Sequence, residues 1–172
     1  RVVLMTQSGN KVLVVDPEKC TGCGICTLVC SFRHNNEYNP ARALLTIIRD
    51  EKHGINIPVI CQHCDTPLCM ESCPSEAIYR DAKTNAVCIN QDNCIGCHQC
   101  LVACPFGGIH IDPADGRTVK CDLCEGYAMC AQFCPREALL YITPSDLTKR
   151  LREKGVKKAA EFLHVISGGA KK

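Results

Sequence analysis

Cysteines dominate the chemistry that this chain can perform. The segment Cys20–Cys30 holds four of them, with two, two and three residues between successive members. The segment Cys94–Cys104 repeats that spacing, and two further groups differ only in the middle gap. The other two tetrads are Cys61, Cys64, Cys69 and Cys73, and Cys121, Cys124, Cys130 and Cys134. Because 16 of the 17 cysteines fall into tetrads, the chain is expected to bind metal through thiolates.

The spacing within a tetrad favours iron–sulfur clusters over zinc or disulfides. The first three cysteines can wrap one corner of a cubane, while the fourth lies past a short helical turn and reaches a second cluster. Pro74, Pro105 and Pro135 follow the last cysteine of three tetrads, as in bacterial two-cluster ferredoxins. Structural zinc prefers isolated cysteine pairs, and none stands alone here. Four tetrads therefore predict four [4Fe–4S] clusters, with a three-iron cluster at an individual site as the open alternative.

Composition and charge narrow the class of protein further. Cysteine at about 10% of residues is typical of secreted disulfide scaffolds, but residues 1–10 contain no apolar run of the signal-peptide kind. No stretch approaches the roughly 20 apolar residues of a membrane helix. The formal net charge is +2; 16 thiolates and four oxidised cores bring the holoprotein to about −6. We expect a cytoplasmic protein of oxygen-sensitive, anaerobic chemistry that binds no nucleic acid and has no membrane span.

Short elements must position the tetrads. The end of each tetrad suits a short helical turn that a following proline terminates, as at 26–30 and 100–104. Residues 31–60 form the longest insertion without cysteine. Ser145 is the expected N-cap of a C-terminal helix that Gly155 interrupts, followed by a second helix over 156–166. The expected strands cover residues 11–15, 86–89, 109–111 and 118–120.

The sequence also repeats in a larger unit. The residues before Cys20 parallel those before Cys94, and the segment after Cys73 parallels the segment after Cys134. The repeated unit is therefore a pair of tetrads that occurs twice.

These four motifs, in this order over residues 12–142, resemble the electron-transfer subunits of molybdenum and tungsten oxidoreductases of the dimethyl sulfoxide reductase type. The resemblance implies an α+β fold of two fused ferredoxin-like [4Fe–4S] modules related by pseudo-twofold symmetry. The double domain would cover 1–143, with an outer module from 11–35 and 105–143 and an inner module from 58–104. Residues 144–172 would form a helical extension that docks on a partner.

The resemblance also implies that the first tetrad shares clusters with the fourth, and the second with the third. The 20 residues between Cys73 and Cys94 agree with that pairing, because small two-cluster ferredoxins have a similar gap. Pairing of neighbouring tetrads, the first with the second and the third with the fourth, is the rival. The implied ligand sets are Cys20, Cys23, Cys26 and Cys134; Cys121, Cys124, Cys130 and Cys30; Cys61, Cys64, Cys69 and Cys104; and Cys94, Cys97, Cys100 and Cys73.

The expected function follows from the same resemblance. The chain would not itself be a catalyst. It would transfer electrons between a large catalytic subunit with a tungsten or molybdenum pterin cofactor and an external electron donor or acceptor. Further redox subunits would also be compatible with this role. Only five residues separate Cys124 from Cys130. This short form resembles the small subunits of tungsten aldehyde oxidoreductases and tungsten benzoyl-CoA reductases. A free polyferredoxin, or a subunit of a carbon monoxide dehydrogenase or hydrogenase, is the alternative.

Three features outside the ligand sets have simpler interpretations. Cys88 aligns with Val14 in the repeat and is expected to be a small buried hydrophobe. His63 and His98 lie inside tetrads that lack no cysteine, so exposure to solvent, or a hydrogen bond that tunes a cluster, is favoured over ligation. The basic residues of 149–158 form either a solvated helix face or a docking surface.

Overall fold

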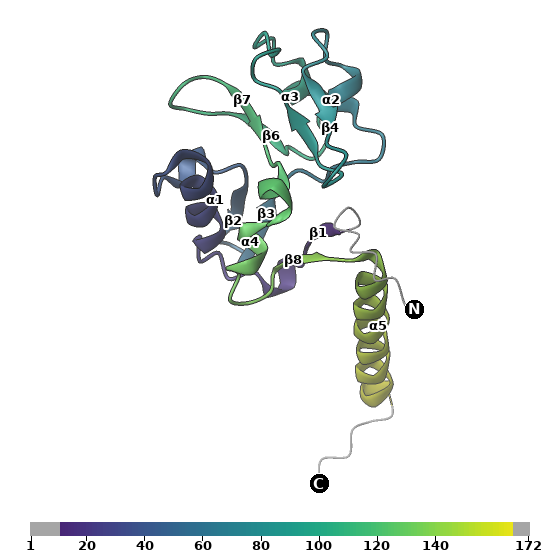
Figure 1. Cartoon of the computed structure of the whole chain (residues 1–172). Coiled ribbons are helices and arrows are strands. Elements are labelled where there is room, and N and C mark those ends of the chain that lie inside the picture. The colour runs from purple at the N-terminus through teal and green to yellow at the C-terminus, as the bar shows by residue number, and fades with distance from the viewer. Residues whose placement is uncertain (1–10, 167–172) are drawn as a thin grey trace, which may run out of the picture. The chain divides into compact units, whose positions relative to one another are not determined.

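Figure 1 shows the computed structural model of the chain, which describes residues 11–166 and the side chains of residues 11–161. It is a mixed α/β structure of short strands and helices, and the expected fold class is confirmed to that extent. The pseudo-twofold symmetry stays a prediction. The elements are β1 (Val12–Val15), η2 (Pro17–Lys19), α1 (Ile25–Asn35), η3 (Pro40–Arg42), β2 (Thr46–Asp50), β3 (Ile55–Val59), α2 (Leu68–Glu71), β4 (Ile78–Arg80), β5 (Val87–Ile89), α3 (Gln99–Ala103), β6 (Ile109–Ile111), β7 (Thr118–Lys120), η4 (Leu123–Gly126), α4 (Met129–Gln132), β8 (Leu139–Ile142) and α5 (Pro144–Ile166).

Strand pairing ties tetrads together that are distant in sequence. β1 precedes the first tetrad and pairs with β8, which follows the fourth. β5 precedes the third tetrad and pairs with β4, which follows the second. Equivalent hydrogen bonds extend both pairs: the Asp16 N–H donates to the Ala138 carbonyl at 2.8 Å, and the Asn90 N–H donates to the Ala77 carbonyl at 2.7 Å. The backbone therefore joins the first tetrad to the fourth and the second to the third.

The insertion between the first two tetrads contains a hairpin that the sequence did not predict. β2 and β3 pair antiparallel from Thr46 opposite Val59 to Asp50 opposite Ile55. Most residues of both strands are exposed. β2 does not alternate apolar and polar residues, and β3 contains Pro58, which argues against a strand in a sequence. β6 and β7 form a further hairpin, at the positions expected for strands.

The helices differ from the expectation in length and in their ends. α1 continues to Asn35, five residues beyond Cys30, because no proline follows that cysteine. The break expected at Gly155 is wrong: α5 runs unbroken to Ile166, since a helix tolerates one glycine at modest cost. Thr143 rather than Ser145 caps α5, because its Oγ1 accepts the Asp146 N–H at 3.2 Å and Pro144 takes the first helical position.

Cysteine side chains form much of the hydrophobic core. One cluster of buried residues combines Leu45, Ile60 and Leu139 with Cys26, Cys30, Cys61, Cys121 and Cys130. A second combines Ile78, Val87 and Ile109 with Cys69 and Cys100. α1 packs against α4 around the first, and α2 against α3 around the second (Figure 1). The stability of the hydrophobic core consequently depends on what the thiols bind.

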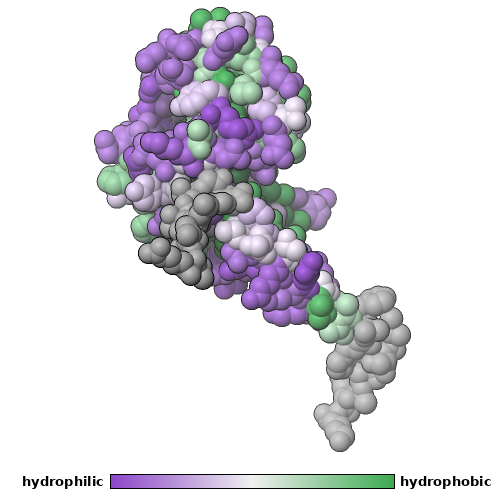
Figure 2. All heavy atoms as spheres, turned by 45° about the vertical axis from the view of Figure 1, so that its right-hand side comes forward, coloured by the Kyte–Doolittle hydropathy of each residue, from purple (hydrophilic) through white to green (hydrophobic). Residues whose placement is uncertain are grey.

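Large hydrophobic residues also remain at the surface near the tetrads. Val102 is 85% exposed and Ile95 is 67% exposed, and Phe106 and Phe133 are half exposed. On the face shown in Figure 2, such residues form separate groups among hydrophilic ones. No helix within residues 11–166 is both long and apolar enough to cross a bilayer.

Contacts within the chain separate a small C-terminal unit from the rest. The boundary falls between Tyr141 and Ile142, so that α5 belongs to the second unit. The division of the first unit into an outer and an inner ferredoxin-like module stays a prediction.

Gly108 offers a test of the packing around Cys61. A Cβ atom at residue 108 would lie 2.7 Å from the Cα of Cys61 and 2.9 Å from its backbone nitrogen, and backbone cannot swing aside as a side chain does. We expect Gly108→Ala to destabilise the holoprotein by about 1–3 kcal/mol. The measurement is the urea midpoint at which visible absorption is lost under anaerobic conditions.

Gly155→Ala is the matched control for that substitution. Nothing lies within 4 Å of a Cβ atom at residue 155, and alanine is favoured over glycine inside a helix by about 0.5–1 kcal/mol. The control should not lower the midpoint. Equal midpoints for Gly108→Ala and the wild type would contradict the steric argument.

Candidate metal centres

The first candidate centre joins the two ends of the cysteine-rich region. Cys20, Cys23, Cys26 and Cys134 line one cavity, with apolar walls that include Ile47 and Leu139. Cys26 lies in the first turn of α1, and Cys134 follows α4. Burial, with the neighbouring thiols Cys23 and Cys134 adding to it, raises the pKa of Cys26 to about 11.

The second candidate centre is buried. Its thiols come from Cys30, in the middle of α1, and from Cys121, Cys124 and Cys130; all four are buried. Burial raises the pKa of Cys30 to about 12, and the nearby charge of Cys124 contributes. Cys130 has its pKa raised by burial and then by Cys30 and Cys124. Cys30, Cys121 and Cys130 also lie in one cluster of buried residues, which brings the first and fourth tetrads together.

The third and fourth candidate centres share the second and third tetrads. Cys61, Cys64, Cys69 and Cys104 line one cavity, together with His63, Val87 and Lys120. Cys73, Cys94, Cys97 and Cys100 line another. The cavity volumes are about 270 Å³ and about 10 Å³, against about 20 Å³ at the first centre. What the centres have in common is therefore four grouped thiols rather than a common volume.

One backbone position has the same conformation in every tetrad. The residue before the second cysteine is Gly22, His63, Gly96 or Leu123, and its φ is 68°, 47°, 67° and 60° respectively. This left-handed region is open to glycine and strained for other residues. It turns the loop so that a backbone N–H can face sulfur: the His63 N–H donates to Cys61 Sγ and the Leu123 N–H to Cys121 Sγ, both at 3.4 Å.

Other amides donate to the cysteines that end a tetrad. The Leu44 N–H donates to Cys30 Sγ at 3.2 Å, and the Ala138 N–H donates to Cys134 Sγ at 3.2 Å. Amide donors stabilise the anionic form of the sulfur they contact. These amide donors are therefore suited to stabilising the negatively charged sulfur of a thiolate ligand.

The donor set fits iron–sulfur clusters. All 17 cysteines are free thiols, and burial raises the pKa of those at the second centre, Cys121 most clearly. An isolated thiolate is costly in such surroundings, but bound metal cations deprotonate a thiol outright. Groups of four thiols are the ligand complement of a [4Fe–4S] cluster. The burial of these thiols therefore favours thiolates bound to the positively charged iron–sulfur core of a cluster over thiolates without metal.

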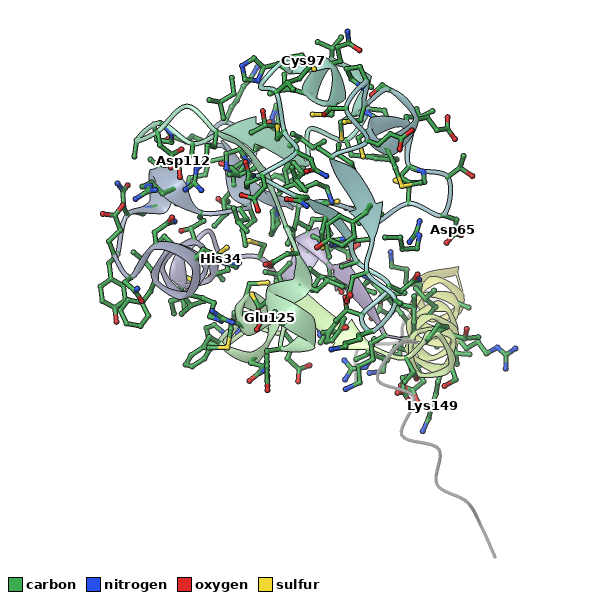
Figure 3. All side chains as sticks on the ribbon, turned by 45° about the horizontal axis from the view of Figure 1, so that its top comes forward. His34, Asp65, Cys97, Asp112, Glu125 and Lys149 are labelled. Carbon is green, nitrogen blue, oxygen red and sulfur yellow. The ribbon has the colours of Figure 1, made fainter. Side chains whose placement is uncertain are left out.

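Sequence reasoning missed a polar group beside the second centre. His34 Nε2 lies 3.0 Å from Asp122 Oδ1. The atoms of His34, Asp122 and Cys124 that are able to ligate a metal all lie within 4.8 Å of one another. Figure 3 shows His34 on α1 near Glu125, whose carboxylate pairs with Arg33 at 2.9 Å. No motif marks these residues, because they come from segments about 90 positions apart.

Known families match most of the cysteine-rich region. Residues 52–143 match the family described as 4Fe-4S dicluster domain, and residues 11–32 match the family described as 4Fe-4S binding domain. The chain belongs to the 4Fe-4S dicluster domain family. It therefore binds multiple [4Fe–4S] clusters, which confirms the predicted cofactor, and the four tetrads are consistent with four of them.

Relatives of this dicluster protein include redox subunits. The polyferredoxin-like subunit of aliphatic sulfonate oxidoreductase from Pyrococcus furiosus is 35% identical over 71% of this chain and 70% of the relative. Protein NrfC from Escherichia coli is 34% identical over 90% of this chain and 78% of the relative. These relatives support an iron–sulfur electron-transfer subunit of oxidoreductase complexes as the class of this protein.

A solved structure also aligns with the chain. The BamBC active-site complex of benzoyl-coenzyme A reductase, as isolated, gives 23% identity over 76% of this chain and 75% of that chain, with a TM-score of 0.45. This TM-score is too low to establish a shared fold.

Cys88 provides a test of which thiols bind metal. Its side chain lines a separate cavity with Tyr79 and Lys120, its Sγ lies 3.8 Å from the Ala86 carbonyl, and burial raises its pKa to about 11. We expect Cys88→Ala to keep the full iron and sulfide content, whereas Cys124→Ala should lose iron. Iron and acid-labile sulfide assays on anaerobically purified protein check this. Iron loss from Cys88→Ala equal to that from Cys124→Ala would refute it.

Proposed function

We propose that the chain carries four [4Fe–4S] clusters and conducts electrons as a subunit of an oxidoreductase complex. One observation carries the proposal: three cavities are each lined by three cysteines of one tetrad and a fourth from another. In addition, Cys30 of the first tetrad shares a buried cluster with Cys121 and Cys130 of the fourth. These groupings agree with the ligand sets that the family resemblance implies. The pairing of β1 with β8 and of β4 with β5 supports the same combination of tetrads over the rival pairing of neighbours.

Each cluster, when bound, supplies a carrier for one electron. The chain contributes the spacing between carriers. Cys26 and Cys30 lie four residues apart on α1, a rise of about 6 Å along a helix axis. One helical turn thereby holds a ligand of the first centre and a ligand of the second. Cys100, on α3, and Cys104, its C-cap, stand in the same relation at the fourth and third centres.

Burial gives the order of the proposed wire. Cys23 of the first centre and Cys97 of the fourth are exposed, and Figure 3 shows Cys97 at the edge of the molecule. The second centre is buried, and Cys61 of the third packs into the same hydrophobic cluster as Cys121 and Cys130. Electrons would therefore enter and leave at the first and fourth centres and cross the core through the second and third.

We further propose a large catalytic subunit with a tungsten or molybdenum pterin cofactor as the partner at one end. The short fourth tetrad supports this, and so does the similarity to a subunit of an oxidoreductase from Pyrococcus furiosus. An external donor or acceptor would serve the other end. The free thiols support a reducing compartment, for which we propose the cytoplasm.

Substitutions of single ligands test the pairing of tetrads. Under the proposal, Cys30→Ser and Cys130→Ser change the same paramagnetic centre, although the two residues belong to the first and fourth tetrads. Cys23→Ser changes a different centre. EPR-monitored redox titration of the three variants checks this, with about 16 iron and 16 sulfide atoms per wild-type chain. If Cys30→Ser and Cys23→Ser alter one common centre and Cys130→Ser another, the pairing is wrong.

Removal of the C-terminal unit tests the partner. We expect a chain ending at residue 143 to keep its iron but to release the catalytic subunit, because α5 contributes no cysteine and its described side chains are mostly exposed. Affinity purification from the native host, with metal analysis for tungsten and molybdenum, measures both effects. Full-length protein that retains all its iron but brings down no such metal would favour a free polyferredoxin or another class of redox enzyme.

A further inference from the structure

His63 lines the cavity of the third centre and is held in one orientation. It shares that cavity with Cys61, Cys64, Cys69 and Cys104. The backbone N–H of Val87, which is 1% exposed, donates to His63 Nδ1 at 3.0 Å. A backbone amide can only donate, so Nδ1 accepts and the neutral ring carries its proton on Nε2. The structure thereby fixes the tautomer as well as the position of the ring.

The proton on Nε2 has no acceptor among the described residues. Nε2 is buried, and no hydrogen-bond partner lies within reach of it. Buried N–H groups are nearly always paired, so an orphan of this kind points to a missing acceptor. The ring lines a cavity surrounded by four thiols, and the acceptor that such a cavity is built to hold is sulfur.

The backbone at His63 is a second, independent observation. Its φ of 47° lies in the left-handed region, and the equivalent position holds glycine in the first and third tetrads and the buried Leu123 in the fourth. Glycine would relieve the strain at no steric cost. A bulky ring in a position that favours glycine indicates that its side chain has a use.

Cationic groups gather around the same cavity. Lys120 is 5% exposed, lines the cavity, and donates from Nζ to the carbonyl of Val87, whose N–H holds His63. The Arg80 guanidinium donates to the carbonyls of Cys64 and Asp65. By contrast, the groups beside the second centre include Asp122 and Glu125. Positive charge and N–H donors favour whichever state of the bound group is more negative.

We propose that His63 Nε2–H donates a hydrogen bond to a sulfur atom of the cluster in the third centre and raises its reduction potential. The inference rests on the proposed cluster assignment. Reduction adds one electron, and hence one negative charge, to the cluster, with no bond broken and no proton transferred. The hydrogen bond strengthens as charge on sulfur grows, so it stabilises the reduced state more than the oxidised state. The potential of the third centre is thereby higher than it would be without this hydrogen bond.

His63→Asn removes the Nε2–H donor, because the asparagine side chain ends in an amide one atom closer to the backbone than Nε2. Asparagine tolerates the left-handed region better than most residues, and its Oδ1 can accept the Val87 N–H in place of Nδ1. We expect the midpoint potential of one centre to fall by about 59 mV, a tenfold change in its one-electron reduction equilibrium. The other centres should keep their potentials. The measurement is an EPR-monitored redox titration of the anaerobic holoprotein.

His98→Asn is the matched control. His98 also has a positive φ, 59°, but its Nδ1 lies 3.0 Å from Thr118 Oγ1 and it lines the cavity of the fourth centre. This variant should leave the centre that His63→Asn alters at its wild-type potential. Cys104→Ser identifies that centre as the third, because it should perturb the same resonance.

A second measurement needs no change at residue 63. Histidine labelled with ¹⁵N, incorporated into His98→Asn protein, should give a weak hyperfine coupling to the reduced third centre, too small for direct ligation to iron. An unchanged potential in His63→Asn protein with full iron content, or no such coupling, would overturn the inference while the proposed wire stands. Iron content far below four clusters in the wild type would instead refute the proposed function itself.

Discussion

Two cysteines four residues apart on one helical turn are the constraint on which the rest of this structure depends. Cys26 and Cys30 show it most clearly: both lie on α1, yet one faces the first group of thiols and the other the second. The turn must be helical to set the distance, and the loop before it must pass through a left-handed residue such as Gly22. A short strand behind the loop then anchors it, as β1 does through β8. α1 and α3 meet the first of these needs, and β1 and β5 meet the last.

A second consequence concerns the core. Cys121 and Cys130 are buried among Leu45, Ile60 and Leu139, and burial raises the pKa of both thiols. Thiolates there become stable only when metal compensates their charge. With no Trp and only four Phe in the chain, carbon alone supplies a modest core. Folding and cofactor binding are consequently one process in the proposed holoprotein, as in other small metal-dependent domains.

The sequence predicted what local spacing controls and failed where distant segments meet. The strands at 109–111 and 118–120 and the helical turns at Cys26 and Cys100 follow from short patterns. The β2–β3 hairpin was not predicted because its residues are mostly exposed, β2 lacks alternation of apolar and polar residues, and β3 contains Pro58. Gly155 was over-weighted as a helix breaker, since its position in α5 is exposed and unstrained. The His34–Asp122 contact and the Val87–His63 hydrogen bond join segments whose proximity no local pattern reveals. The ligand sets came from family resemblance and stay a prediction, which the cavities of the first, third and fourth centres support.

The pairing of β1 with β8 has a consequence for biosynthesis. Residues of the second and third tetrads meet their partners within a continuous stretch, and β4 and β5 form a local hairpin. The first tetrad, by contrast, must wait for a strand and a cysteine roughly 100 residues downstream, which a ribosome adds in on the order of 5–20 s. During that interval the inner segment is already complete while the N-terminal thiols lack their last companion. Under the proposed pairing, the growing chain therefore completes the two inner ligand sets, which end at Cys104, before the two outer ones, which end at Cys134.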